Sequence, residues 1–290
     1  MANAKLQRLE EMLHGYGSCL VAYSGGVDSV FLAHVAHRCL GDRALAVIAD
    51  SPSLPRRELR EAFEIAQQFK IPVRVVNTAE FVDDRYLANP TNRCYFCKSA
   101  LFTELVPLAK SLNLAVVVYG ENASDLGDHR PGAKAAGEYL VRSPLKEAGL
   151  TKAEIRELSA EFGLPTADKP QLACLSSRIP TGEAVTPAKL RMIEEAEYAL
   201  RDLGFHDVRV RHHEASGSLG ISAPASLARI EIGPAELGRL FADGLHVRVE
   251  EQLREIGYAH VTIDLAGYRR GSTNGVTRQP THSPVRFQTA

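Results

Sequence analysis

The sequence predicts an α/β protein, with a doubly wound parallel sheet followed by a smaller C-terminal α+β domain. In the first half of the chain, short apolar runs alternate with segments of helical periodicity. This order favours parallel strands with helices on both faces. After residue 180, apolar and polar residues alternate as they do in half-buried strands. At 290 residues the chain can bury a substantial core and has room for two domains.

The elements of the first half follow from periodicity and from helix-capping residues. Leucines at helical spacing predict a helix over 5–14. A capping box of Thr151 and Glu154 opens a helix that extends to residue 162. Two segments, 126–137 and 163–180, are interpreted as loops. The expected strands are 19–23, 44–49, 71–76 and 114–119, and the other expected helices are 30–40, 55–69 and 97–112.

The second half is assigned in the same way. Thr186 and Pro187 supply the N-cap and the first residue of a helix that reaches residue 203. From residue 271 onward the sequence is polar and unpatterned, which predicts a disordered tail. We therefore predict domains at 1–179 and 180–271, with the tail at 272–290. The expected strands are 207–212, 228–232 and 260–265, and the expected helices are 234–241 and 244–256.

The turn over 24–29, between the first strand and the first helix of the sheet, predicts an anion site. Successive backbone N–H groups and the helix dipole favour negative charge at such a turn. Gly25 and Gly26 let the backbone approach a ligand closely, and Ser24 and Ser29 add hydroxyl donors. Asp28 would repel a phosphate unless a cation lay between them, which makes it a candidate Mg²⁺ contact.

This turn is not a Walker-type loop, because the pattern G-x-x-x-x-G-K-[ST] occurs nowhere in the chain. It resembles the PP-loop of the N-type ATP pyrophosphatases, which cleave ATP between the α and β phosphates. Ligands of doubly wound sheets bind outside the carboxyl ends of the strands. We therefore expect the adenosine near Asp50 and Ser51 and near the segment that begins at Gly120. Arg130 or Lys134 could reach a phosphate or the substrate.

Composition and charge argue against several classes of protein. The chain is 45% hydrophobic and 24% charged, and its net charge of −1 provides no electrostatic footprint for nucleic acid. No apolar run approaches the ~20 residues that cross a bilayer. The polar, helical N-terminal segment does not have the pattern of a signal peptide. We therefore expect a cytoplasmic protein without nucleic-acid or membrane partners.

Five cysteines, an odd number, argue for reactive or metal-bound thiols rather than disulfides. Cys19 and Cys39 fall in a strand and a helix, where a small buried side chain is expected. Cys94 and Cys97 form a C-x-x-C motif, and Cys174 lies in the loop over 163–180. Three thiolates are one short of a structural zinc site. They fit a 4Fe–4S cluster that leaves one iron open to a hydrosulfide.

Three segments, 24–29, 128–132 and 173–180, together resemble the LarE family of ATP-dependent sulfur transferases. The resemblance extends over roughly residues 6–271. It implies that the substrate is a pyridinium-3,5-biscarboxylic acid mononucleotide, a precursor of the nickel-pincer nucleotide of lactate racemase. ATP would convert each carboxylate to an acyl-adenylate, and sulfur would displace AMP to leave a thiocarboxylate. The family also implies a homo-oligomer, trimeric or hexameric.

The resemblance implies how sulfur is supplied. Family members with a single cysteine at the position of Cys174 give up its sulfur and are left with dehydroalanine. This chain also has Cys94 and Cys97, and so resembles the variant in which a three-cysteine cluster holds sulfide from another donor and delivers it. Sacrificial donation from Cys174 remains an alternative, as does an incidental role for Cys94 and Cys97.

The resemblance also assigns charged residues. Arg178 would pair with a carboxylate or phosphate of the substrate by a bidentate contact. Arg209 and Arg211 alternate along a strand, so they face the same side, and by resemblance they would hold the nucleotide phosphate. The alternative for both is a solvated strand face. Glu197 and Glu231 match acidic positions of a family metal site only loosely, and surface salt bridges are the expected role of each.

Other functions remain open at this point. A tRNA thiolase shares the PP-loop and a three-cysteine cluster, but the net charge and the lack of a terminal zinc ribbon argue against it. A PP-loop ligase or amidotransferase that uses ammonia would not need three cysteines. A non-enzymatic alternative is a nucleotide-binding regulatory module with a redox-sensing cluster. Asp28 and Arg178 argue against this alternative. Fold by itself decides none of these.

Overall fold

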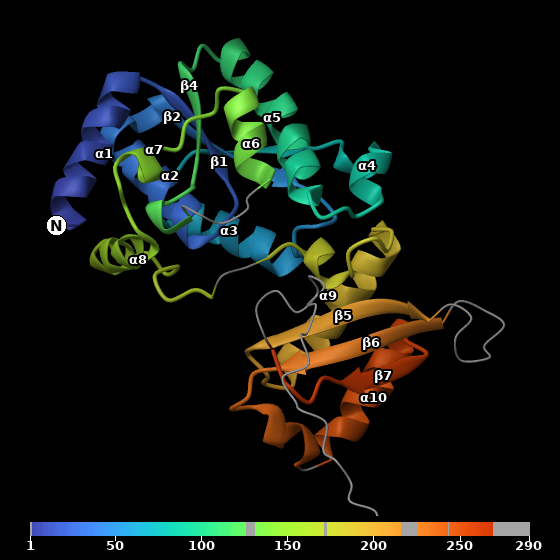
Figure 1. Ribbon diagram of the computed structural model, residues 1–290. Helices are drawn as coiled ribbons and strands as arrows, with labels where there is room; N and C mark the ends of the chain where they lie inside the picture. The colour runs from blue at the N-terminus through green and yellow to red at the C-terminus, as the bar shows by residue number, and fades with distance from the viewer. Residues whose placement is uncertain (1, 126–130, 171–172, 216–224, 243, 269–290) are drawn as a thin grey trace, which may run out of the picture. The chain divides into compact units, whose positions relative to one another are not determined.

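The computed structural model describes residues 2–125, 131–170, 173–215, 225–242 and 244–268 (Figure 1). By contacts between residues, the chain divides into two compact units. The first contains residues up to 177 together with 184–194, and the second contains 178–183 together with residues from 195 onward. The predicted tail at 272–290 lies outside the described residues, and the domain boundary at residue 180 stays a prediction.

The first unit contains a four-stranded parallel sheet, which confirms the predicted doubly wound α/β fold. Its strand order is β3-β2-β1-β4, so that β1 is central and the chain crosses over on both sides of it. The strands are β1 (Cys19–Tyr23), β2 (Ala44–Asp50), β3 (Val73–Asn77) and β4 (Val116–Tyr119). The helices are α1 (Ala2–Tyr16), α2 (Val27–Leu40), α3 (Arg56–Gln68), α4 (Asp84–Leu87), α5 (Arg93–Ser111), α6 (Pro131–Glu138), α7 (Pro144–Glu147) and α8 (Lys152–Glu161). Short 3₁₀ helices are η1 (Gly41–Arg43), η2 (Glu80–Val82), η3 (Ala123–Asp125) and η4 (Leu175–Arg178), the last of which crosses the unit boundary.

Every residue of β1 is buried because helices cover both faces of the sheet. Alternate residues of the strand point to opposite faces. Val21 packs in a core with residues of α1, α2 and α3, whereas Leu20 packs in a second core with residues of α5 and α6. Burial on both faces explains why the strand appears in the sequence as a continuous apolar run.

Several elements differ from the sequence-based prediction: α4 and α7 were not expected, η4 lies in the expected loop over 163–180, and the expected helix over 234–241 is the 3₁₀ helix over 237–241. Three further differences bear on the site. α2 begins at Val27, earlier than expected, so the turn over 24–29 passes directly into a helix. α5 begins at Arg93, which places the C-x-x-C motif inside the helix rather than at a loop-to-helix junction. Residues 131–138 form α6 instead of a loop, because Pro131 suits a first helical position and the segment is rich in alanine. The capping box of Thr151 and Glu154 is present as predicted and opens α8.

The second unit contains a three-stranded sheet in the order β5-β6-β7, which confirms a smaller C-terminal sheet domain. β5 pairs with β6 in the antiparallel sense, and β6 pairs with β7 in the parallel sense. The strands are β5 (Val208–Ala215), β6 (Ala225–Ile232) and β7 (His260–Ile263). The helices are α9 (Pro187–Asp202), which contributes to both units, α10 (Leu245–Ile256), and the 3₁₀ helix η5 (Leu237–Phe241).

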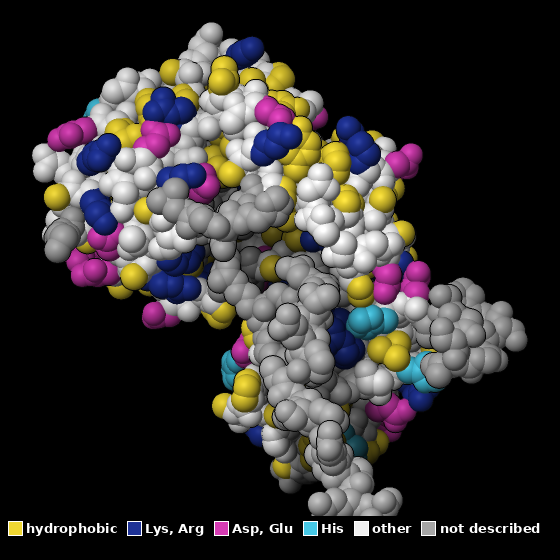
Figure 2. Space-filling model, in the orientation of Figure 1, with side chains coloured by type: hydrophobic (Ala, Val, Ile, Leu, Met, Phe, Trp, Pro, Cys, Tyr) yellow, Lys and Arg dark blue, Asp and Glu magenta, His cyan; other side chains and the backbone are white. Residues whose placement is uncertain are grey.

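Two surface features bear on the predicted partners. In the described part of the chain, no helix is both long and apolar enough to span a membrane. On the face of the first unit drawn in Figure 2, Lys and Arg side chains are interspersed with Asp and Glu side chains.

Candidate functional site

The turn after β1 has the geometry of an anion cradle. Gly25 has a φ of +71°, and a Cβ at this position would lie 2.7 Å from the Cβ of Ala62. Glycine is therefore required by both conformation and space. Gly26 is the N-cap of α2 and makes no side-chain cap bond, so the first N–H groups of the helix remain available to an anion.

Two serines close the turn on itself. The buried Ser29 accepts a hydrogen bond from the backbone N–H of Ser24 (3.1 Å) and donates to the carbonyl oxygen of Gly26 (3.0 Å). The two serine hydroxyls lie 3.0 Å apart. These bonds fix the loop backbone and hold the exposed Ser24 hydroxyl at its mouth.

Asp28, in the first turn of α2, is only partly satisfied by the protein. Its Oδ2 accepts from Lys152 Nζ (2.9 Å) and from Asn122 Nδ2 (3.3 Å). Its Oδ1 is buried and has no hydrogen-bond partner. A half-buried carboxylate with one unpartnered oxygen beside a phosphate cradle fits the predicted Mg²⁺ contact. The sequence does not single out Lys152 as a site residue, because it lies between the two capping-box residues Thr151 and Glu154 and belongs to no binding motif.

A cavity of about 350 Å³ in the first unit brings most of the predicted site residues together. Gly25, Asp50 and Cys94 are not among its lining residues, and Asp50 instead pairs with Arg56. Arg130 lies outside the described residues, and the exposed Lys134 lies near Glu138 of its own helix. The predicted residues that line the cavity are Ser24, Gly26, Asp28, Ser29, Ser51, Cys97, Gly120 and Cys174.

Cys97 and Cys174 therefore line the same cavity as the phosphate loop, although they are far apart in sequence. Cys94 and Cys174 are exposed and Cys97 is half-buried. Burial, followed by the nearby charges of Cys174 and Glu80, raises the pKa of Cys97 to about 12. The charge of Cys94 also contributes to this pKa, so the sulfurs of Cys94 and Cys174 both lie near that of Cys97.

The other two cysteines are structural. Cys19 is buried in β1, as expected, and burial raises its pKa to about 12. Cys39, in α2, is only half-buried, whereas a buried side chain was expected.

A triangle of buried hydroxyls holds the segment that carries Cys174. Ser53, Tyr86 and Ser176 lie 2.6 to 2.8 Å from one another through their hydroxyl oxygens. The backbone N–H of Leu175 donates to the carbonyl oxygen of Ser53 (2.9 Å). The residue after Cys174 is thereby bonded to the loop after β2, and sequence reasoning found none of these contacts.

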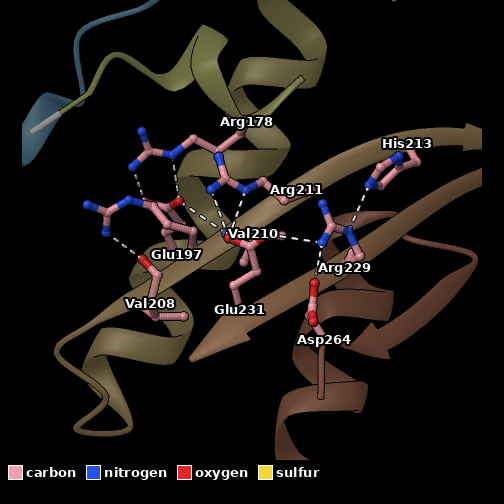
Figure 3. A network of polar contacts seen from close by, with 10 residues as sticks. Arg178, Glu197, Val208, Val210, Arg211, His213, Arg229, Glu231 and Asp264 are labelled. Atoms are coloured by element: carbon pink, nitrogen blue, oxygen red, sulfur yellow. Dashed lines mark hydrogen bonds and ion pairs between the residues drawn. The ribbon is translucent and has the colours of Figure 1, made fainter. Parts of the chain in front are cut away.

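The second unit holds the predicted arginines in a buried ionic cluster (Figure 3). Arg178 is 2% exposed and donates through Nε and Nη2 to the two carboxylate oxygens of Glu197 (2.8 and 3.1 Å). Arg201 and the backbone N–H of Val210 also donate to Glu197. Burial would raise the pKa of Glu197, but the charges of Arg178, Arg201 and Arg209 hold it below its usual range.

Arg209 and Arg211 both lie on β5 and both are buried, so a solvated strand face is excluded. Arg211 donates twice to Oε2 of Glu231, and Arg229 pairs with Oε1 of the same carboxylate. Arg209 donates to the carbonyl oxygen of Val208 (2.8 Å) and stacks on the ring of Tyr268. Burial and the charge of Arg178 lower the pKa of Arg209.

The expectation of surface salt bridges for Glu197 and Glu231 was wrong, because both carboxylates are fully buried. Each forms ion pairs, as expected, but with guanidiniums that are largely withdrawn from water. Sequence alone could not show this burial, because the partners of Glu197 come from different segments. They are Arg178, Arg201 of α9 and the backbone of Val210 in β5. In this cluster of described residues, guanidiniums outnumber carboxylates.

The architecture of the first unit and its glycine–serine turn are those of the PP-loop class of α/β proteins. A family model described as NAD synthase matches residues 3–89, which contain this turn. An uncharacterized protein of Synechocystis is 42% identical over 276 residues, 95% of this chain and 99% of the relative. A tRNA-specific 2-thiouridylase of Rickettsia felis is 28% identical, but over only 52% of this chain and 51% of the relative.

A third relative narrows the class to a family. The pyridinium-3,5-bisthiocarboxylic acid mononucleotide synthase of Lactiplantibacillus plantarum is 34% identical over 255 residues, which cover 88% of both chains. At this identity and coverage, the chain belongs to the LarE family.

Proposed function

We propose that this protein is an ATP-dependent sulfur transferase. It adenylylates the carboxylates of pyridinium-3,5-biscarboxylic acid mononucleotide and converts them to thiocarboxylates. The observation that carries the proposal is a cavity lined both by the phosphate loop and by two cysteines, Cys97 and Cys174. The name of the Lactiplantibacillus relative, a bisthiocarboxylic acid mononucleotide synthase, supports the choice of substrate.

The residues of the phosphate loop bind ATP in this proposal. The N–H groups at the start of α2 and the hydroxyls of Ser24 and Ser29 receive the pyrophosphate part of ATP. Asp28 binds Mg²⁺ through its unpartnered Oδ1, while Lys152 holds the other oxygen. This arrangement concentrates positive charge where the bond between the α and β phosphates breaks.

The need for ATP follows from the chemistry of a carboxylate. Its oxygen is a poor leaving group, so attack by sulfur requires that the adenylyl group of ATP first be transferred to this oxygen, which then leaves as part of AMP. The carboxylate attacks the α phosphorus, the bond to pyrophosphate breaks, and a sulfur nucleophile then attacks the activated carbon and expels AMP. Cys97 and Cys174 border the same cavity as the loop, which is the position that such a nucleophile requires.

Cys94, Cys97 and Cys174 would hold a 4Fe–4S cluster. The donor set fits in type, since the thiols of Cys94 and Cys174, on two segments, both lie near that of Cys97. In the described part of the chain, no three His, Cys, Asp or Glu side chains are already arranged to hold a metal ion. Ligation therefore requires the exposed Cys94 and Cys174 to turn toward Cys97. When bound, such a cluster supplies an open iron on which sulfide from an external donor can be held.

The second unit receives the substrate in this proposal. Arg178, Arg209 and Arg211 are buried in one cluster, and the guanidinium groups of this cluster outnumber its carboxylates. A nucleotide phosphate would complete the charge balance of this cluster. We further propose that the protein has no nucleic-acid partner, in keeping with its net charge of −1. We also propose a homo-oligomer, as the family resemblance implies.

The test is an anaerobic assay with ATP, Mg²⁺, sulfide and the pyridinium mononucleotide, combined with iron and labile-sulfide counts. We expect thiocarboxylate, AMP and pyrophosphate in equal amounts, and one 4Fe–4S unit per chain. Cys→Ser at position 94, 97 or 174 should remove iron and multiple-turnover thiolation together. Product that forms without ATP cleavage would exclude the proposed reaction.

Intact-mass measurement separates the two sulfur sources. With cluster delivery, the mass of the chain stays unchanged after turnover. A loss of about 34 Da, the mass of H₂S, would mean that Cys174 gives up its own sulfur. Steeply salt-dependent tRNA binding, with thiolated nucleosides as product, would favour the tRNA thiolase instead.

A further inference from the structure

The cavity of the first unit contains a buried carboxylate with no role in the function proposed above. Glu80, the first residue of η2, follows β3 and is 2% exposed. Its Oε1 accepts a hydrogen bond from the hydroxyl of Ser51. Its Oε2 is buried and has no hydrogen-bond partner, and the residue lines the cavity.

A buried carboxylate oxygen without a partner is costly, because it has lost water and gained nothing in return. The polar neighbours of Glu80 do not remove this cost. The hydroxyl of Ser51 already donates its hydrogen to Oε1. The backbone N–H of Ser53 donates to Ser51 rather than to Glu80. A hydrogen-bond donor on the ligand in the cavity would satisfy Oε2.

The position of Glu80 along the sheet indicates which part of the ligand it meets. The phosphate loop follows β1, Ser51 follows β2 and Glu80 follows β3, which are adjacent strands in this order. Neighbouring strands lie about 4.8 Å apart, so the end of β3, which Glu80 follows, lies about 10 Å along the sheet edge from the end of β1. The ribose joins directly to the phosphates, whereas the base lies at the far end of the nucleoside.

On the other side of the loop, the end of β4 comes very close to the loop backbone. A Cβ on Gly120, at the end of β4, would lie 3.0 Å from backbone atoms of Asp28 and Ser29. The end of β4 therefore packs directly on the phosphate loop. The cavity extends from the loop past the ends of β2 and β3, where Ser51, Thr78 and Glu80 line it and leave room for a nucleoside.

We infer that Glu80 selects the base of ATP by accepting a hydrogen bond from the 6-amino group of adenine. This inference rests on ATP being the nucleotide, as in the proposed function. Adenine presents an N–H donor at this position, whereas hypoxanthine and guanine present a carbonyl oxygen that a carboxylate oxygen repels. Glu80 thus determines nucleotide specificity without taking part in the chemistry at the phosphorus.

Calorimetric titration of the full-length protein with ATP and with ITP, in the presence of Mg²⁺, tests the inference. ITP differs from ATP only in having oxygen in place of the 6-amino group. We expect the wild-type protein to bind ATP about tenfold to a hundredfold more tightly, as for one hydrogen bond to a charged group. Wild-type protein that binds the two nucleotides equally would overturn the inference, whatever the behaviour of any variant.

Glu80→Gln preserves the size of the side chain and can donate from its amide to the carbonyl of hypoxanthine. The preference for ATP over ITP should therefore fall to about one. Glu104→Gln, an exposed glutamate of α5, is the matched control and should leave the preference unchanged. An unchanged preference in Glu80→Gln would overturn the inference.

Three further outcomes separate this inference from the proposed function. If Glu80→Gln altered only the discrimination against 2′-deoxy or 3′-deoxy ATP, the carboxylate would contact the ribose and the assignment to the base would be wrong. If wild-type protein bound neither ATP nor ITP, the proposed function would fail, and the inference with it. Binding of ATP with no dependence on Glu80 would remove the inference alone.

Discussion

The cavity of the first unit and the ionic cluster of the second are both buried and polar, yet the pKa values of their acidic groups shift in opposite directions. In the cavity, burial raises the pKa of Cys97 and leaves one oxygen each of Asp28 and Glu80 without a partner. In the cluster, arginines surround Glu197 and hold its pKa below the usual range. The difference lies in the partners that the fold supplies, because the desolvation cost is present in both.

This contrast separates two ways of preparing an anion site. The phosphate loop uses backbone N–H groups and hydroxyls, which carry no net charge and leave carboxylates free for a cation. The cluster uses guanidiniums whose positive charge is only partly balanced by Glu197 and Glu231. Substitutions in the cavity should therefore affect activity more than stability. Substitutions in the cluster should lower stability, and those of Arg209 and Arg211 should also weaken the proposed binding of the substrate.

The largest effect on stability is expected for Glu197→Ala. Removal of this carboxylate leaves Arg178 buried without its ion-pair partner, which costs about 3 to 5 kcal/mol in the free energy of unfolding. Glu195→Ala, an exposed residue of the same helix, is the control and should change it by less than about 0.5 kcal/mol. Chemical denaturation measures both, and equal losses for the two variants would refute the contrast.

Asp28→Ala should show the opposite pattern. Loss of a metal contact should slow the formation of AMP and pyrophosphate by about a hundredfold or more, roughly 3 kcal/mol. The free energy of unfolding should change by less than about 1 kcal/mol, because the ion pair with Lys152 is partly exposed. Normal pyrophosphate release by this variant would exclude the PP-loop assignment.

Gly25→Ala tests the geometry of the cradle. The positive φ and the contact with Ala62 should together cost about 1 to 3 kcal/mol in the free energy of unfolding and abolish ATP binding. Gly15→Ala, in α1 with open space around the position, should instead be neutral or stabilise the protein by up to about 1 kcal/mol. Thermal or chemical unfolding of the pair gives the comparison.

The depressed pKa of Glu197 predicts a pH dependence. The unfolded chain binds a proton at this residue at a higher pH than the folded chain, so the ion pairs contribute fully above the unfolded pKa of about 4.3. Their contribution is lost as the pH falls further, through the folded pKa, by up to about 1.4 kcal/mol per pH unit. The difference in unfolding free energy between wild type and Glu197→Gln should shrink over this window, and a constant difference would contradict the assignment.

The smallest effect is expected for Tyr86→Phe, in the neutral hydroxyl triangle under Cys174. The two serine hydroxyls can still bond to each other, so the loss should be about 1 to 2 kcal/mol. The control is Tyr139→Phe, whose hydroxyl makes an exposed bond with Thr103 and should cost less than about 0.5 kcal/mol. If Tyr86→Phe lost as much unfolding free energy as Glu197→Ala, the neutral hydroxyl triangle and the charged cluster would not differ in their effect on stability.

Local sequence predicted the strands and the phosphate loop, and it singled out Cys97 and Cys174, which line the cavity. A buried parallel strand appears as an apolar run, and a glycine–serine turn before a helix has few structural alternatives. The start of α5 was placed too late because cysteine and aromatic residues favour a helix only weakly, so tertiary packing decided the boundary. For the same reason, the C-x-x-C motif was placed in the wrong local setting.

Long-range contacts could not be predicted from the sequence. Nothing in the order of residues brings Cys174 to the cavity of Cys97, or pairs Lys152 with Asp28. The burial of Glu197 and the unpartnered oxygen of Glu80 likewise depend on which elements pack around them. Residue type and spacing determine backbone conformation and the chemistry that is available, because these are local. Burial and partners, which set the pKa and the role of each charged group, depend on distant segments and arise only when the chain folds.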